Sequence, residues 1–514
     1  MPATVLSAAT HGIQALPVHV EVDTSRQLPM FTVVGLPDGA IRESRERVMA
    51  AVRNAGFQWP RRRVTVNLAP ADVRKEGSAF DLAIAVGILA ASGQLATDRL
   101  DDFVLLGELS LDGTLRPVRG ALSMAFGMRE KGAYGMVVPC HNAREAAMAA
   151  GPLIYGVGSL AEAVEVLEGS TRLQPYCSDA AAAFQQQQQD DVGFNDVRGQ
   201  QQVKRALEVA AAGGHNVLLV GPPGSGKTML ARRMPSILPD FSLEEALVTT
   251  RVHSVAGTLK PGQALVATRP FRAPHHTVSD AGLIGGGSYP RPGEVSLANH
   301  GVLFLDELPE FRRHVIESLR QPLEDHSVTI VRVAVAVTYP ASFMLVAAMN
   351  PCPCGYLGDT RRDCTCSMAA IQRYRTRISG PVMDRLDLHV QVPAVRYSEL
   401  ADSAAGEGSD AIRQRVNAAR QRQLTRFSDD QELFCNARLS SRQVRQYCRP
   451  EPAAATLLER AINQLALSAR AYDRILKVAR TIADLEDAQT IAAPHVAEAV
   501  QYRSLDRTQS TTVA

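Results

Sequence analysis

Short apolar runs alternate with helical patterns over the first 170 residues. Segments 41–55 and 80–91 repeat their apolar positions with helical spacing. Between them lie apolar or alternating runs of four or five residues, the length and pattern typical of strands. The four clearest runs are 18–22, 30–34, 64–68 and 103–106. Because helices and strands are interspersed, the sequence predicts an α/β or α+β domain over 1–170.

A second α/β segment follows a low-complexity stretch. Alanine, glutamine and aspartate dominate 180–191, which is too polar to bury a core of its own, so we expect a linker over 171–191. Apolar spacing then predicts a helix over 200–211. Three further runs are continuously apolar, as buried strands are, and together they predict a domain over 192–395. These runs are 217–220, 302–305 and 343–349.

The remaining segment, 396–505, has the apolar spacing of helices, and the polar residues 506–514 are expected to be a disordered tail. Five arginines fall on one predicted helix. They suit contact with phosphate groups, and a solvated helix face explains them equally well. These arginines are Arg413, Arg415, Arg420, Arg422 and Arg426.

The loop after the run at 217–220 carries the first candidate chemistry. It matches the phosphate-loop pattern at every fixed position, between a predicted strand and a predicted helix. Glycines let backbone N–H groups face phosphates, while Lys227 reaches the β- and γ-phosphates and the Thr228 hydroxyl ligates Mg²⁺. The pattern predicts an ATP–Mg²⁺ site and not a turn without function. The loop residues are Gly221, Pro222, Pro223, Gly224, Ser225, Gly226, Lys227 and Thr228.

Polar residues also follow the next two buried runs. Asp306 and Glu307 come after 302–305, which is the Walker B pattern. We expect Asp306 to hold the Mg²⁺ shell and Glu307 to polarise the attacking water. Asn350 follows 343–349, at the strand end where an open parallel sheet places its ligands. This position suits an asparagine that orients water beside the γ-phosphate, and an ordinary turn asparagine is the alternative.

Four of the eight cysteines lie close together in the sequence. They form two C-x-C pairs separated by nine residues, directly after Asn350. Such a cluster in a protein expected to be cytoplasmic predicts a tetrahedral Zn²⁺ site, with reduced free thiols as the alternative. The neighbouring pair His275–His276 has no accompanying ligand spacing, so a loop or helix-start role is favoured for it over metal binding. The cysteines are Cys352, Cys354, Cys364 and Cys366.

Composition excludes several classes of protein. The 46% hydrophobic and 21% charged content is ordinary for a globular protein, and a net charge of +2 gives no strong electrostatic signature. No apolar run reaches the roughly 18 residues of a membrane span, and the first residues lack a secretion signal. We therefore expect a cytoplasmic protein of two to four domains with no membrane association.

Two segments of the first domain resemble the proteolytic domain of Lon proteases. They are 75–84 and 107–122, and the resemblance implies a serine–lysine dyad. Ser78 lies near the serine position, but Ser123 occupies the lysine position. Because a serine without its base is a poor nucleophile, we expect a Lon-protease-like fold without peptidase activity, which serves interaction or oligomer stability.

The second and third segments resemble AAA+ ATPases of the magnesium-chelatase branch. Segment 194–200 is similar to the stretch that lies against adenine in AAA+ proteins, and 328–337 is similar to a hairpin that lines the pore in ring helicases. Arg385, within 380–387, matches the arginine finger that reaches a neighbouring subunit's γ-phosphate, although pairing with Asp384 or Asp387 is an alternative. Arg470 matches the sensor 2 arginine, with Arg474 as a rival.

Taken together, the domain order is similar to that of the ComM/YifB family of magnesium-chelatase-like AAA+ ATPases. The resemblance implies a Lon-like domain, a P-loop core (192–395) with a cysteine knuckle at 350–366, and a helical lid (396–505). It also implies a homo-hexameric ATPase and DNA helicase that acts on single-stranded and branched DNA in natural transformation, alongside recombination proteins. A chelatase-like or protein-remodelling ATPase with a protein client, or an ATP-binding scaffold, are the alternatives.

Overall fold

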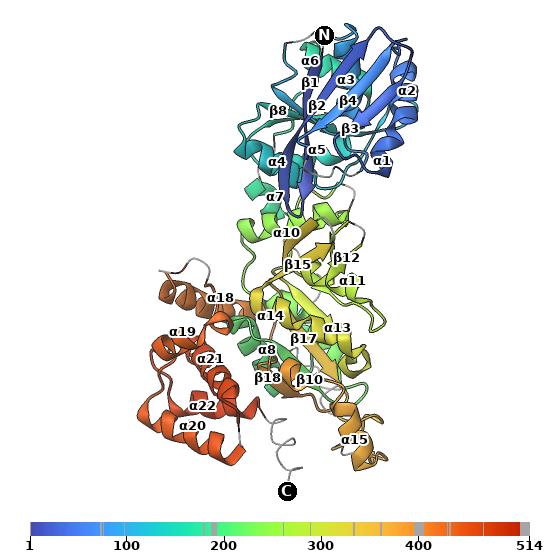
Figure 1. Cartoon of the computed structure of the whole chain (residues 1–514). Coiled ribbons are helices and arrows are strands. Elements are labelled where there is room, and N and C mark those ends of the chain that lie inside the picture. Colours follow the sequence, from blue (N-terminus) through green and yellow to red (C-terminus); the bar gives the residue numbers. More distant parts are fainter. Residues whose placement is uncertain are drawn as a thin grey trace.

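The computed structural model divides the chain into three stacked parts (Figure 1). An N-terminal α/β domain lies at one end, a P-loop core lies in the middle, and a helical lid lies beside the core at the other end. The described residues are 2–71, 75, 77–96, 98–177, 180–186, 193–260, 262–287, 289–332, 335–359, 362–394, 406–428, 430, 433–465 and 467–503. The expected disordered tail lies outside these ranges.

A seven-stranded mixed sheet forms the N-terminal domain, in the spatial order β3-β4-β2-β1-β5-β8-β9. β2 alternates buried and exposed residues, as a strand with one covered face does. The four strands predicted here are confirmed, while β1, β8 and β9 were not predicted. The strands are β1 Ala3–His11, β2 Gln14–Ser25, β3 Phe31–Val34, β4 Arg63–Ala69, β5 Phe103–Leu105, β8 Gly135–Pro139 and β9 Leu153–Val157, and a small hairpin adds β6 Glu108–Leu109 and β7 Leu115–Arg116.

Helices cover both faces of this sheet. One apolar cluster joins the sheet to α2, α3 and α6, and a second joins it to α4 and α5. Because α3 lies between the sheet and its neighbouring helices, it is apolar on nearly all sides. The helices are α1 Gly39–Arg42, α2 Ser44–Asn54, α3 Asp81–Ala91, α4 Ala121–Glu130, α5 Cys140–Ala147 and α6 Leu160–Glu168.

A helix that was not predicted lies within the linker. This helix is α7 (Ala180–Gln186), and its Phe184 packs against Phe241 at a ring-centroid distance of 6.2 Å. The low-complexity composition concealed it, because one buried aromatic residue suffices to fix a short helix to a surface that is distant in sequence.

The core is built on a five-stranded parallel sheet with the order β11-β14-β17-β10-β18. Its strands are buried on both faces, which explains their continuously apolar sequences. The strands are β10 Val217–Val220, β11 Phe271–Arg272, β14 Val302–Leu305, β17 Met344–Met349 and β18 Leu388–Gln391, and the surrounding helices are η1 Phe194–Asp196, α8 Gln201–Gly213, α9 Lys227–Arg233, η2 Met234–Ile237, η3 Leu308–Glu310, α13 Arg313–Ser318, α14 Arg320–Asp325, α15 Met368–Arg375 and α16 Gly380–Met383.

Inserted elements connect the core to the N-terminal domain. The predicted hairpin before β17 is confirmed as β15 (Ser327–Arg332) and β16 (Val335–Pro340). Across the junction, Tyr289 donates a 2.8 Å hydrogen bond to the Thr10 carbonyl, and Arg251 donates one of 2.6 Å to that of Ile13. The other inserted elements are α10 Leu243–Ala256, α11 Asp280–Leu283, β12 Gly285–Gly286, β13 Arg291–Pro292 and α12 Glu294–Leu297.

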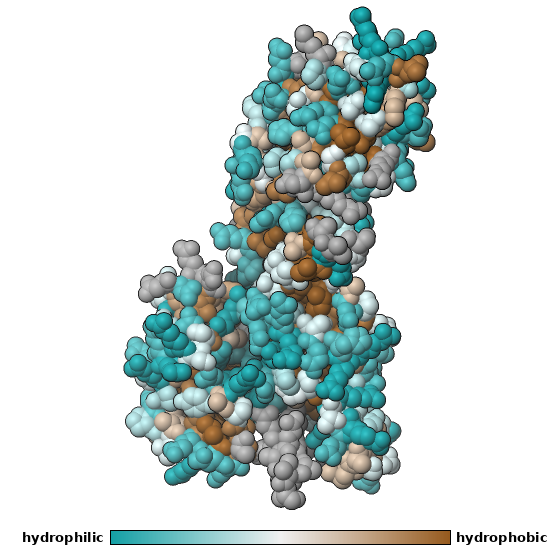
Figure 2. All heavy atoms as spheres, viewed as in Figure 1, coloured by the Kyte–Doolittle hydropathy of each residue, from teal (hydrophilic) through white to brown (hydrophobic). Residues whose placement is uncertain are grey.

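The lid shares a hydrophobic core with α8 and does not form a separate globule. Its helices are α18 Ser409–Arg426, η4 Asn436–Arg438, α19 Ser441–Tyr447, α20 Pro452–Leu465, α21 Ala469–Leu485 and α22 Ala493–Gln501. In Figure 2, hydrophilic side chains dominate the visible surface of the core and lid, whereas apolar side chains are more frequent on the N-terminal domain and its junction. Among the described residues, no helix is both long and apolar enough to cross a membrane.

Candidate nucleotide site

The phosphate loop lies between β10 and α9, at the carboxyl end of β10. Gly224 and Gly226 have φ angles of 76° and 89°, which glycine adopts without steric cost. A Cβ atom at Gly221 would lie 2.2 Å from the Val392 carbonyl oxygen. The glycines are therefore needed for the turn and for close approach to the strand beside it.

Lys227 lies at the centre of this loop. Its Nζ donates to the carbonyl oxygens of Gly221 and Pro222 at 2.8 and 2.9 Å, and to Asn350 Oδ1 at 3.2 Å. Burial lowers its pKa. An ammonium group whose hydrogen-bond acceptors are neutral oxygens retains its attraction for phosphate. The oxygens of a bound phosphate would replace these acceptors.

Thr228 and Asp306 come together from neighbouring elements. Thr228 Oγ1 donates a 2.7 Å hydrogen bond to Asp306 Oδ2, which connects the start of α9 to the end of β14. A hydroxyl and a carboxylate are hard oxygen donors of the kind that Mg²⁺ prefers. The pair therefore fits the predicted role of holding the ion that neutralises phosphate charge.

Glu307 follows Asp306 in a left-handed backbone conformation, with φ of 52°. Its side chain is 58% exposed, and its Oε2 lies 3.8 Å from His276 Nδ1. The predicted loop role of His275 and His276 agrees with their position, and the contact with Glu307 was not foreseen. It joins two loops that are 31 positions apart, so no local sequence signal could reveal it.

These predicted residues line one hollow of about 450 Å³. Gln200, before α8, fixes the loop from behind by donating to the Ser225 carbonyl at 2.8 Å and to that of Pro393 at 3.2 Å. The φ angle of Gln200 is 53°, a left-handed backbone conformation that marks this residue as structurally unusual. The lining residues are Pro223, Gly224, Ser225, Gly226, Lys227, Thr228, Met229, Asp306, Glu307, Met349 and Asn350.

Arg385 lies at the opposite edge of the sheet. It precedes β18, which runs parallel to β10, so it is at the amino edge while the phosphate loop is at the carboxyl edge. Its guanidinium pairs with Glu324 and donates to the Pro381 carbonyl at 2.5 Å. The local partner is thus neither of the two aspartates that were considered from sequence.

The two candidate sensor arginines on α21 lie at this same edge. Arg470 Nη1 is 3.5 Å from Asp384, and Arg474 Nη1 is 3.5 Å from Asp387. Arg470 is 70% exposed, whereas Arg474 is largely buried against the core. Of these two arginines, only Arg470 has a side chain exposed enough to contact a group on another chain.

Sequence comparisons cover the whole of this arrangement. The profile described as magnesium chelatase, subunit ChlI, matches 193–400, and related ChlI profiles match 20–142 and the C-terminal residues 406–503. YifB of Escherichia coli is 44% identical over 97% of this chain and 96% of its own length. Competence protein ComM of Haemophilus influenzae is 44% identical over 98% of both chains. The chain belongs to the magnesium-chelatase-like ComM/YifB family. The magnesium-chelatase 38 kDa subunit of Rhodobacter capsulatus is a more distant relative, 28% identical over 35% of this chain and 54% of its own.

In this ComM/YifB family member the four clustered cysteines converge on one point. Their sulfur atoms all lie within 4.8 Å of one another, with Cys352 Sγ 3.4 Å from Cys354 Sγ and 3.6 Å from Cys364 Sγ. The Cys354 amide donates to Cys366 Sγ at 3.3 Å. Backbone N–H groups of Tyr356 and Thr365 lower the pKa of Cys354 to about 6, whereas desolvation and the neighbouring thiols raise the pKa values of Cys364 and Cys366. Four converging sulfurs fit a structural Zn²⁺ ion.

The cysteine knuckle also touches the nucleotide site. A Cβ atom at Gly355 would lie 2.6 Å from Pro223 in the phosphate loop. The Arg375 guanidinium donates to the Pro351 carbonyl at 3.4 Å, which joins the knuckle to α15. The knuckle therefore packs directly against the phosphate loop. The sequence showed that the knuckle follows Asn350, but it did not reveal this contact.

The arginines of α18 serve the protein interior more than the surface. Arg415 pairs with Glu208 and Glu407, and Arg426 Nη1 is 3.0 Å from Asp484 Oδ2. Most of these guanidinium groups are thus committed to other elements. Contact between the exposed face of this helix and a phosphate backbone, one of the two roles considered from sequence, has little support here.

In the N-terminal domain the residues at the two dyad positions lie in different surroundings. Ser78 Oγ donates to Glu108, a carboxylate in place of a lysine. Ser123, at the expected lysine position, is fully buried on α4. Glu108 thus stands where the resemblance implies a lysine amine as the base, and Ser123 supplies no base at the lysine position.

Proposed function

We propose that this protein is an ATP-hydrolysing ring motor whose nucleotide sites are shared between neighbouring subunits. The observation that carries this proposal is the position of Arg385 and Arg470 at the sheet edge opposite Lys227. Because one chain cannot bring these arginines to its own phosphate loop, a second copy must supply them. A closed ring satisfies every site in this way, and the family resemblance favours six subunits.

Each site residue then has one role. Lys227 and the loop amides bind the β- and γ-phosphates, while Thr228 and Asp306 hold Mg²⁺, which supplies charge neutralisation. Glu307 orients and polarises the attacking water, and Asn350, already 3.2 Å from Lys227 Nζ, keeps that water beside the γ-phosphate. The neighbour's Arg385 leaves Glu324 and stabilises the charge that develops in the transition state.

DNA is the proposed substrate of the motor, which we infer to be a cytoplasmic helicase that promotes branch migration during transformation and recombination. Support comes from full-length similarity to a relative named as a competence protein. The hairpin β15–β16 supports it as well, since its end exposes Val331, which is 65% accessible, next to the Arg332 cation. An exposed hairpin with a cation at its end suits contact with a nucleic-acid strand.

A protein-remodelling function is the second candidate. It is favoured by similarity to magnesium-chelatase subunits, which covers 35% of this chain. The ComM relative, in contrast, matches 98% of this chain, and for this reason we rank protein remodelling second.

For the N-terminal domain we propose a Lon-protease-like fold without peptidase activity. The contact between Ser78 and Glu108, and the burial of Ser123, support the loss of activity. The domain packs on the inserted elements of the core through Arg251 and Tyr289, so it is suited to stabilise the ring.

The direct test is ATP-dependent processing of a synthetic three- or four-way DNA junction. We expect junction conversion that requires hydrolysable ATP, together with faster hydrolysis when single-stranded DNA is added. Lys227→Ala is the matched inactive control. If DNA leaves the hydrolysis rate unchanged and binds no better than another acidic polymer, the DNA assignment is wrong while the ATPase assignment stands.

A further inference from the structure

A second cavity lies at the amino edge of the core sheet, away from the phosphate loop. Its volume is about 320 Å³, which is within the usual range for small-ligand sites. Its floor is formed by residues that immediately precede four parallel strands. These residues are Asn216, Gly301, Phe343 and Asp387.

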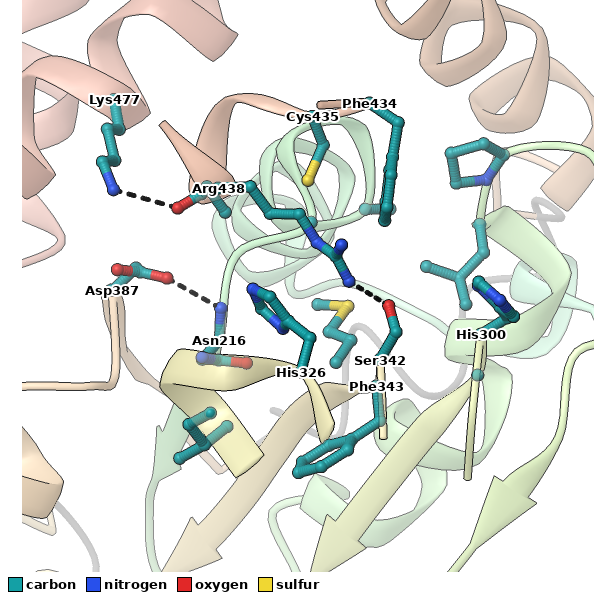
Figure 3. Close-up of a pocket in the computed structure, with 18 of the residues that line it drawn as sticks. Asn216, His300, His326, Ser342, Phe343, Asp387, Phe434, Cys435, Arg438 and Lys477 are labelled. Atoms are coloured by element: carbon teal, nitrogen blue, oxygen red, sulfur yellow. Dashed lines mark hydrogen bonds between the residues drawn. The ribbon is translucent and has the colours of Figure 1, made fainter. Parts of the chain in front are cut away.

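The lid forms the opposite wall of this cavity (Figure 3). Arg420 comes from α18, Lys477 comes from α21, and Phe434 and Arg438 come from the segment between them. In Figure 3, Arg438 extends across the cavity to Ser342, and its guanidinium carbon lies 4.0 Å from the centre of the Phe434 ring. The cavity is therefore the place where the lid and the sheet edge face each other.

Positive charge is in excess around this cavity. Six cations line it, against three carboxylates, and each carboxylate already has an arginine partner within 4.0 Å. The cations are Arg269, Arg385, Arg420, Arg438, Arg474 and Lys477, and the pairs are Arg269–Glu245, Arg385–Glu324 and Arg474–Asp387.

Three of the six cations are held only by neutral groups within the part of the chain that the structure describes. Arg438 donates to the Ser342 hydroxyl, and Lys477 Nζ donates to the Ala437 carbonyl at 3.0 Å. Arg420 donates to the Ala212 carbonyl at 3.2 Å, and its Nε atom is buried with no acceptor among the described atoms. Burial lowers the pKa of each. Glu245 attracts Arg420 and Arg438, and Asp387 attracts Lys477, but each of these carboxylates is already paired with another arginine. Buried cations that share their counter-ions in this way are stabilised when a further anion joins them.

Two histidines complete the polar lining. Burial lowers the pKa values of His300 and His326 to about 4, and nearby guanidinium groups contribute to this in both cases. Both imidazoles are therefore neutral near pH 7, and each can donate one N–H group to an anion. The cavity offers several converging donors, and its carboxylates are already paired.

We propose that this cavity binds a small phosphate-bearing anion, separate from the ATP site, through Arg420, Arg438 and Lys477 of the lid and Ser342 of the sheet edge. Bound there, the anion would connect the lid to the core sheet. Because Arg385 and Arg474 line the same cavity, occupancy would also influence the position of the arginine that serves the neighbouring subunit. The inference concerns a site beyond the proposed ATPase and does not depend on its substrate.

The test measures pyrophosphate binding by calorimetry in full-length Lys227→Ala protein, whose phosphate loop is disabled. We expect one site per chain, and AMP as a second probe tells whether a phosphate ester is also accepted. Adding Arg438→Gln should weaken pyrophosphate binding about tenfold or more, because it removes a charged donor from the cavity. Arg116→Gln, at an exposed arginine of the N-terminal domain, is the matched control and should leave binding unchanged.

Lys477→Met in the same background keeps the test decisive if Arg438→Gln does not fold, since the one hydrogen bond of Lys477 within the described ranges goes to a backbone carbonyl. The proposal is overturned if Lys227→Ala protein binds no pyrophosphate, or if neither cavity substitution weakens binding. Displacement of pyrophosphate by an oligonucleotide would also overturn it, because the occupant would then be DNA backbone.

Discussion

Glu307 has a backbone conformation that few residues other than glycine adopt. Its φ of 52° disfavours any side chain with a Cβ atom, by roughly 1 kcal/mol or more. The strain is retained because it directs the carboxylate away from β14 and toward the hollow that Lys227 and Asn350 line. The left-handed conformation of Glu307 is therefore explained by the proposed role of its carboxylate and not by a contribution to folding stability.

We predict that Glu307→Gln binds ATP normally and hydrolyses it at least about 100-fold more slowly, since an amide cannot polarise the attacking water as a carboxylate does. Retention of ATP by the isolated variant, together with its turnover rate, measures both properties. Lys227→Ala is the contrasting control, because it should lose binding itself. Normal turnover by the glutamine variant would show that another group activates the water.

At the scale of single residues, sequence was most informative where a motif fixes chemistry over a few positions. Thr228, Asp306 and Asn350 lie together as their motifs predict, because each follows or begins an element of one parallel sheet. The partner of Arg385 could not be predicted in this way. Glu324 is 61 positions away, and only the tertiary fold brings it close.

The cysteine knuckle is an element whose stability depends on what its sulfurs bind. The four thiols lie within 4.8 Å of one another, in a loop that contacts the phosphate loop. They leave little apolar surface to hold the cysteine loop in place. In such small loops a metal ion supplies the stabilisation that a hydrophobic core would otherwise provide.

We predict one Zn²⁺ per purified chain and its loss in Cys352→Ser, measured by elemental analysis. Loss of the ion should also lower ATP affinity, because the knuckle packs on Pro223. Cys177→Ser, at an exposed cysteine of the linker, should keep the full metal content. A native protein that carries no metal, with four freely titrating thiols at these positions, would contradict the zinc assignment.

A buried carboxyl group connects two helices across the junction of the N-terminal domain and the core. Glu145, on α5, accepts a 3.0 Å hydrogen bond from Asn142 and lies near Ser254 of α10, and burial raises its pKa to about 7. A carboxyl with a raised folded-state pKa keeps its proton longer than in the unfolded chain, so stability decreases as pH rises from about 4.5 to about 7.

We predict that Glu145→Gln raises the unfolding midpoint at pH 8 and has little effect near pH 4.5. The upper limit of the gain is about 3 kcal/mol, from a pKa difference of roughly two units. Calorimetric scans at the two pH values measure the change, and Glu168→Gln, at an exposed residue of α6, is the control. An equal effect at both pH values would show that the glutamate is not protonated in the folded protein.

At the scale of elements, periodicity predicted those that bury one continuous apolar face. The helices over 41–55, 80–91 and 200–211 are confirmed. The hairpin at 328–337, which was expected from family resemblance and not from periodicity, is confirmed as well. Helix α7 was not predicted, because a single phenylalanine anchors it. The inward-facing arginines of α18 could not be recognised either, because their carboxylate partners lie on other elements.

In the whole molecule, the phosphate loop and Arg385, to which we assign catalytic roles, lie at opposite edges of one sheet. Strand direction determines this separation, since the phosphate loop follows β10 and Arg385 precedes the parallel strand β18. The phosphate loop and Arg385 could be predicted from the sequence, but the sheet edges at which they lie could not. The arrangement of parallel strands depends on crossover connections that no local pattern specifies. If both groups serve one reaction, as we propose, an isolated chain hydrolyses ATP poorly.

Hydrolysis by mixed subunits tests this shared pocket most directly. Lys227→Ala and Arg385→Ala proteins should each be inactive alone. In an equimolar mixture, Arg385→Ala subunits contribute intact phosphate loops and Lys227→Ala neighbours contribute the guanidinium. Random assembly into rings should therefore restore about a quarter of the native rate, because half of the phosphate loops are intact and half of their neighbours carry Arg385. A mixture no more active than its separate components, or an Arg385→Ala protein that is fully active alone, would contradict the account.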